Sequence, residues 1–177
     1  MRKKILYAVL LLVSASLFIL SCQKEIIKKQ QQTKITSEVP KAAIQETIPF
    51  DLNVVLRGEG NSQGHLKFRQ DPDPAKIIDL DIKVHHLAPN HEYLLQRAVD
   101  AINVVDGNCT STSWLTLGKG LTPQSILTDD KGKGEEELWR NVTAIPSGST
   151  FDIHFRVIDA VSSAVVLTSD CHQYQVR

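Results

Sequence analysis

Residues 78–85 read Ile-Asp-Leu-Asp-Ile-Lys-Val-His, and this stretch decides the fold class. Its four apolar residues, Ile78, Leu80, Ile82 and Val84, occupy every second position, and polar or charged residues fill the positions between them. Because successive side chains of a β-strand point to opposite faces, this alternation is typical of a strand with one buried and one wet face. The stretch therefore predicts one strand of a sheet that covers a hydrophobic core.

The same alternation recurs along the chain on both sides of this strand. Longer alternating runs lie at 50–57, 65–69 and 151–157, and shorter strands are expected at 92–100, 135–141, 163–168 and 171–176. Turn residues separate them, as in Gly58-Glu59-Gly60-Asn61, Asp71-Pro72-Asp73-Pro74, Pro89-Asn90, Asp130-Lys131-Gly132 and Pro146-Ser147-Gly148. Many short strands with turns between them predict an all-β domain over residues 48–177, an antiparallel sandwich or barrel.

The N-terminus has the pattern of a secretory signal. Three basic residues, Arg2, Lys3 and Lys4, precede the uncharged apolar run 5–20, and the small residue Ser21 follows. A positive start, an apolar stretch and a small residue before the cut are the parts of a signal peptide. The run is shorter than the roughly 20 residues that a membrane-spanning helix needs. We expect residues 1–21 to be a signal peptide.

The cut site adds a resemblance. Ile19-Leu20-Ser21-Cys22 resembles the lipobox of bacterial lipoproteins: an aliphatic residue, a permissive position, a small residue and a cysteine. The resemblance implies a thioether-linked diacylglyceryl group on Cys22, cleavage before it and acylation of the new N-terminus. Two or more acyl chains hold a protein stably, at about 0.8 kcal/mol per buried methylene. An uncleaved membrane helix, or an ordinary secretory signal that happens to precede a cysteine, is the alternative.

Residues 22–47 are expected to form a flexible tether. The segment is rich in Lys, Gln, Thr and Glu, has no aromatic residue and shows no sustained period. It cannot bury enough apolar area to offset the entropy cost of ordering. Gln23, directly after Cys22, fits transport to an outer membrane by analogy with well-studied lipoproteins, so we expect an outer-membrane lipoprotein facing either the periplasm or the outside.

Charge and cysteine content narrow the partners. The chain has 20 Lys and Arg residues against 20 Asp and Glu residues and no basic stripe, which argues against nucleic acid as a partner. Of its three cysteines, Cys109 and Cys171 remain if Cys22 is lipidated. An exported protein meets an oxidising compartment, so we expect these two to pair, with two free buried thiols as the alternative.

Several segments, read in order, resemble the copper/zinc superoxide dismutase sandwich, an antiparallel Greek-key β-sandwich. The resemblance covers about residues 50–176, and its segments are Gly64-His65-Leu66-Lys67-Phe68, Leu87-Ala88-Pro89-Asn90, Asn108-Cys109-Thr110-Ser111, Thr128-Asp129-Asp130-Lys131-Gly132 and Phe151 to Asp159, followed by Cys171. In that family the final cysteine pairs with the loop cysteine. The resemblance therefore also implies a Cys109–Cys171 bridge.

The family's metal ligands do not carry over to this sequence. Counting from Pro89, its two copper-binding histidines fall on Leu95 and Arg97, and a third falls near Val157. No histidine lies between His91 and His154, where the family has its zinc ligands, and its substrate-guiding arginine matches Thr168. We therefore expect no bound metal, no cofactor and no dismutase activity.

The remaining candidate residues have plain structural interpretations. The adjacent His85 and His86 point to opposite faces if both lie on a strand, so they cannot chelate one metal ion together. Asp152, His154 and Arg156 would share a polar strand face, where His154 is interpreted as an ion-paired surface residue. The segment 129–134 has a faint calcium-loop look, but a hairpin turn suits it better because the alternating acidic ligands are missing. Ser111 and Ser113 lack the context of a catalytic nucleophile.

Trp114 and Trp139 are the candidate binding residues. Together they could form an exposed platform for a ligand or partner, since loops on rigid sandwiches often carry binding. The interpretation we favour is that Trp114 plugs the end of the sandwich beside the disulfide. The sequence thus predicts a non-catalytic, membrane-anchored lipoprotein with a binding or envelope-structural role. A metal-binding or dismutase-type enzyme with displaced ligands, and a surface adhesin for glycan or protein, are the alternatives.

Overall fold

The computed structural model describes residues 48–177. The expected signal peptide at 1–21 and the expected tether at 22–47, with the lipid attachment residue Cys22, lie outside the described residues. Within the described part, no helix is long and apolar enough to cross a membrane.

Residues 48–177 form β-strands joined by turns and loops, and no helix occurs among them, which confirms the expected all-β class. The strands are β1 (Leu52–Arg57), β2 (Gln63–Gln70), β3 (Ile77–His85), β4 (Glu92–Val99), β5 (Leu115–Thr116), β6 (Gly118–Lys119), β7 (Thr122–Pro123), β8 (Ser125–Leu127), β9 (Gly134–Asn141), β10 (Thr150–Asp159), β11 (Val165–Ser169) and β12 (His172–Gln175).

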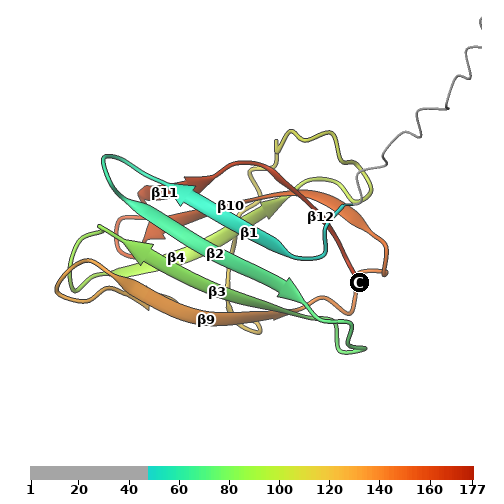
Figure 1. Ribbon diagram of the computed structural model, residues 1–177, viewed down its shortest axis with the longest axis horizontal. Coiled ribbons are helices and arrows are strands. Elements are labelled where there is room, and N and C mark those ends of the chain that lie inside the picture. Colours follow the sequence, from blue (N-terminus) through green and yellow to red (C-terminus); the bar gives the residue numbers. More distant parts are fainter. Residues whose placement is uncertain (1–47) are drawn as a thin grey trace, which may run out of the picture. The chain divides into compact units, whose positions relative to one another are not determined.

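The strands form one sheet that nearly closes into a barrel. Its order is β5-β4-β10-β11-β1-β2-β3-β9-β6-β7, with β12 also paired to β10 and β8 also paired to β4. A bridge between Thr128 and Gly134 brings the end of β8 to the start of β9 and narrows the remaining gap. Figure 1 shows β1, β2, β3 and β9 crossing one side of the domain, with β4 and β10 on the other side.

Nearly all neighbouring strands are antiparallel, as the sequence predicts. The exception is β6, which runs parallel to β9 and pairs Lys119 with Trp139. The sheet is therefore mixed rather than purely antiparallel. The short strands β5 to β8 lie between β4 and β9 in the chain. Within this connection, β6 lies beside β9 and forms the parallel pair.

The core lies between the two sides of the barrel and follows the alternation in the sequence. On β3 the apolar residues Ile78, Leu80, Ile82 and Val84 are at most 5% exposed, whereas Asp79 is exposed. The aromatic residues at one end of the core meet edge to face: Phe68 lies 6.2 Å from Phe155 and 4.7 Å from Tyr174, measured between ring centroids. Such edge contacts add to the stabilisation from burial alone.

The segment 129–134 is a hairpin turn, as expected. The carboxylate oxygen Oδ1 of Asp129 accepts hydrogen bonds from the backbone N–H groups of Lys131, at 2.9 Å, and Lys133, at 2.8 Å. Gly132 has a φ of +69°, and a Cβ atom there would lie 2.1 Å from the Leu87 carbonyl oxygen. Only glycine fits this position, because it needs both the left-handed backbone and the close approach.

Candidate functional site

The candidate site lies on the outer face of β10, beneath the connection between β4 and β5. We call this connection, residues 100–114, the disulfide loop. Cys109 in the loop is bonded to Cys171, directly before β12, with the two Cα atoms 5.4 Å apart. The pairing expected for Cys109 and Cys171 is thus present, and it fixes the loop to the strands that it crosses.

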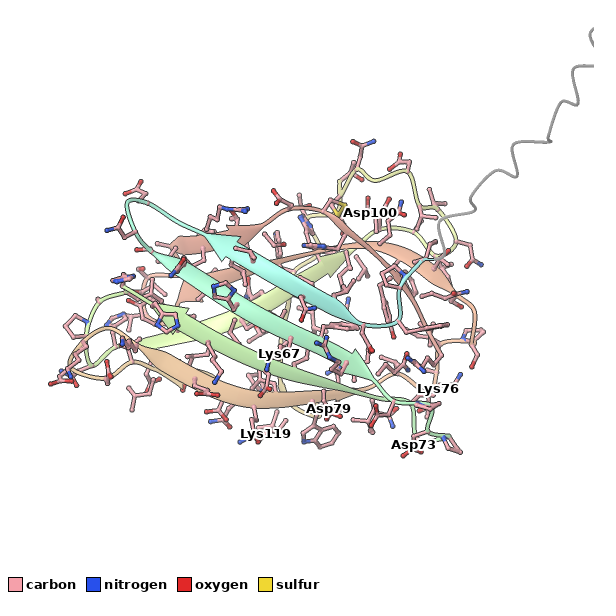
Figure 2. The ribbon with its side chains drawn as sticks, viewed as in Figure 1. Lys67, Asp73, Lys76, Asp79, Asp100 and Lys119 are labelled. Carbon is pink, nitrogen blue, oxygen red and sulfur yellow. A yellow bond between two sulfur atoms is a disulfide. The ribbon has the colours of Figure 1, made fainter. Side chains whose placement is uncertain are left out.

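Two carboxylates hold the backbone of the disulfide loop. Asp100 accepts hydrogen bonds from the backbone N–H groups of Thr110, at 2.8 Å, and Ser111, at 2.7 Å. Asp152 on β10 accepts from those of Asp106, at 2.8 Å, and Gly107, at 3.0 Å. Figure 2 shows Asp100 beside the yellow sulfur bond. These bonds satisfy four backbone donors of the irregular loop, and so they order it.

The hydrogen bonds at Asp100 favour its ionised form. The N–H of Thr110 and then that of Ser111 lower the pKa of the Asp100 carboxyl below its ordinary value of 3.8, in spite of an opposing desolvation effect. A carboxylate that accepts several N–H bonds loses them on protonation, which is why its pKa falls. Formation of the loop is therefore linked to the charge on Asp100.

Trp114 packs onto β10 at the end of the disulfide loop. Its ring lies 4.6 Å from the ring of His154, and the guanidinium carbon of Arg156 lies 3.9 Å from the centroid of the Trp114 ring. His154 Nε2 is 3.0 Å from the Ser111 carbonyl oxygen, and Arg156 Nε donates to Gln96 Oε1 at 2.8 Å. Trp114 therefore covers the outer face of β10 instead of plugging the end of the barrel, and its cation–π contact fixes the ring.

The polar face of β10 also differs in detail from the sequence interpretation. His154 is hydrogen-bonded to the loop and contacts the Trp114 ring at a tilt of 31°, and it has no ion pair among the described residues. Asp152 is only 1% exposed, because the loop at residues 106 and 107 covers it. Strand alternation places these residues on one face, but it carries no information about the loop that crosses that face.

Trp139 lies elsewhere, on β9. It is 41% exposed, and its backbone carbonyl accepts a hydrogen bond from the N–H of Gly120 at 2.9 Å. Its neighbour in the register, Lys119, lies at the lower edge of the view in Figure 2, far from Asp100 of the disulfide loop. No ring contact joins Trp114 and Trp139 in the part of the chain that the structure describes, so the two residues are not brought together as one platform.

The histidines and carboxylates of residues 48–177 form no group of three or more that could hold a metal ion. His85 and His86 have ring centroids 6.5 Å apart, and His91 is paired instead with Asp159 through Nε2 and Oδ2, at 2.5 Å. The positions matched to the copper ligands of the dismutase family are largely interior. Leu95 and Val157 are register partners and both are 0% exposed.

The fold and the loop together define a disulfide-clamped all-β domain. No family model matches this sequence, and a search of curated proteins finds no match to it.

We expect stability in acid to depend on Asp100. Because its pKa is lowered in the folded protein, its contribution to the free energy of unfolding is fully present above about pH 4 and is lost as the pH falls through the lowered pKa. Urea unfolding from pH 6 to pH 2, followed by tryptophan fluorescence, should show Asp100→Asn less stable than the natural chain at pH 6 and the difference closing in acid. Asp130→Asn, at an exposed turn residue, is the matched control and should follow the natural chain. An equal pH dependence of the natural chain and Asp100→Asn would refute the linkage.

Proposed function

We propose that this chain is a bacterial lipoprotein whose β-domain is held on a membrane, most simply the outer membrane, by acyl chains on Cys22. The support is the sequence Ile19-Leu20-Ser21-Cys22 after a basic start and an apolar run. Residues 22–47 act as the tether that lifts the domain off the bilayer, facing the periplasm or the outside. Attachment by several acyl chains gives stable membrane association without a spanning helix.

The domain itself is proposed to be a superoxide dismutase-like Greek-key sandwich. The order β10-β4-β8-β9, in which β10 returns to lie beside β4, matches that of a Greek key with the short strands β5 to β7 inserted between β4 and β8. The Cys109–Cys171 disulfide and the hairpin at 129–132 fall where the sequence resemblance to that family puts them. These three features support the proposal together, since each by itself is common among β-proteins.

The proposed role is non-catalytic, and the pair Leu95 and Val157 carries this part of the proposal. Two positions matched to copper ligands hold hydrocarbon side chains that pack against each other in the core. A third holds Arg97, a fixed cation that repels metal ions. In the resembling family imidazole side chains hold the copper at these positions, and neither hydrocarbon nor guanidinium side chains can replace them as ligands. We therefore propose that the domain binds a ligand or partner or serves as part of the envelope structure.

Metal loading tests the non-catalytic role. The purified full chain should be incubated with copper and zinc, freed of loose metal, and assayed for bound metal and superoxide turnover. We expect less than one copper per chain and no turnover above buffer. The double variant His85→Ala/His86→Ala is the control for nonspecific copper binding by surface histidines and should remove any residual copper. One tightly held copper per chain together with superoxide turnover would establish a dismutase-type enzyme with displaced ligands instead.

A further inference from the structure

A half-open cavity of about 60 Å³ leads into the core of the barrel, and no residue of the disulfide loop lines it. Aromatic and aliphatic side chains form most of its wall, among them Phe68, Phe155 and Leu117. Three polar side chains also reach it: Arg97, Arg140 and Tyr174. An apolar wall with a few convergent polar groups is the usual composition of a small-molecule site.

Arg97 faces the interior from β4. It follows the buried residues Tyr93 and Leu95 at alternate positions, so its side chain points to the same side of the strand. Burial lowers the pKa of its guanidinium, and the charge of Arg140 lowers it further. Among the described residues, no hydrogen bond or ion pair to the Arg97 side chain occurs, although a guanidinium carries five N–H donors.

Arg140 reaches the same cavity from β9. It follows Leu138 at alternate positions, and its Nη1 donates a hydrogen bond to the Gly120 carbonyl oxygen at 3.0 Å. No carboxylate lines the cavity. Two arginines therefore share an apolar space with no counter-ion from the cavity wall. Both arginines are only partly buried, and neither has a buried nitrogen without a partner, so water reaches them. Two cations beside an apolar wall and without a carboxylate repel each other, and an anion from outside would relieve that repulsion.

We propose that this cavity binds a small carboxylic acid, with its carboxylate on Arg97 and Arg140 and its short hydrocarbon tail against the apolar wall. Guanidinium groups match a carboxylate in geometry and charge, since each can donate two parallel hydrogen bonds. The volume sets the length of the tail. At about 10–15 Å³ for each water-sized group, 60 Å³ holds roughly four to six non-hydrogen atoms in all, so a carboxylate leaves room for a tail of about one to three carbon atoms. This inference concerns the domain alone and does not depend on the lipid anchor.

Calorimetric titration of the purified full chain at constant ionic strength tests the proposal, with butyrate as the probe. Acetate keeps the carboxylate but shortens the tail by two methylenes, and butan-1-ol keeps the tail without the charge. We expect saturable binding of one butyrate per chain, and affinities for acetate and butan-1-ol that are at least about tenfold weaker, because acetate buries less hydrocarbon and the alcohol lacks the charged acceptor. No saturable binding of butyrate, or equal affinity for butan-1-ol, would overturn the proposal.

Variants separate binding from folding. Arg97→Met should weaken butyrate binding about tenfold or more, as expected for loss of a charged hydrogen-bond donor, while the ligand-free protein melts at the same or a higher temperature. The matched control is Arg57→Met, which removes an exposed arginine paired with Asp170 at 3.2 Å and should leave butyrate affinity unchanged. Unaltered affinity in a folded Arg97→Met variant would reject the site.

Discussion

Replacing Cys109 and Cys171 together by serine is expected to lower the free energy of unfolding by about 4 kcal/mol. The two residues are 62 positions apart, so the bond closes a long loop in the unfolded chain. Loss of that constraint raises the entropy of the unfolded state. The chain-entropy relation gives about 4 kcal/mol for a loop of this length, which is an upper limit because the relation ignores strain in the folded protein. Urea or guanidinium denaturation of the oxidised natural chain and of the double variant measures the difference directly.

The same comparison has an internal control. The natural chain treated with a strong reductant should unfold like the double variant, because both lack the same bond. A difference below about 1 kcal/mol between the oxidised chain and the double variant would contradict the prediction. Thiol titration under denaturing conditions identifies the reason, since two free buried thiols would react with the reagent and a disulfide would not.

The second large effect is expected at Cys22. Cells grown with labelled palmitate should incorporate the label into the natural chain, and Cys22→Ser should abolish the incorporation completely, because serine cannot form the thioether. The natural chain should also partition with detergent, since each buried methylene contributes about 0.8 kcal/mol to its membrane attachment. The double variant of Cys109 and Cys171 is the control and should keep its label. Equal labelling of Cys22→Ser would mean that the lipid is attached to another residue.

The longer strands could be predicted from the sequence because their cause is local. Alternation of apolar and polar residues gives β3 almost to the residue and β10 within a few residues, and the shorter strands β9 and β11 also lie within a few residues of where they are expected. The first strand begins at Leu52 rather than at Phe50, where the alternation starts. The hairpin at 129–132 also follows from its own residues, through the Asp129 side chain and the backbone freedom of Gly132.

The short strands β5 to β8 could not be predicted in this way. Each has only two or three residues, too few to show a period, and their conformation is set by distant partners, as where Leu115 pairs with Arg97. The same reason explains why the positions of Trp114 and Trp139 were not foreseen. The position of Trp114 depends on how the disulfide loop lies against β10, and that of Trp139 on the pairing of β6 with β9. The spacing of residues in the sequence predicts neither.

The arginine pair shows what a sequence signal would have looked like. Arg97 and Arg140 each follow buried residues at alternate positions on strands that were expected. A charged residue on the buried side of a strand is costly and marks a position that needs a partner. The sequence therefore marks Arg97 on one strand and Arg140 on another as unusual residues. It does not show that they lie at the same cavity, because that depends on how the barrel brings β4 and β9 together.

The most direct test of the membrane-anchored account is the mass of the mature protein purified from cells. We predict a chain that begins at Cys22, with a diacylglyceryl group on its sulfur and an acyl chain on its α-amino group. An unmodified thiol at Cys22, or a mature chain that begins at another residue, would contradict the account.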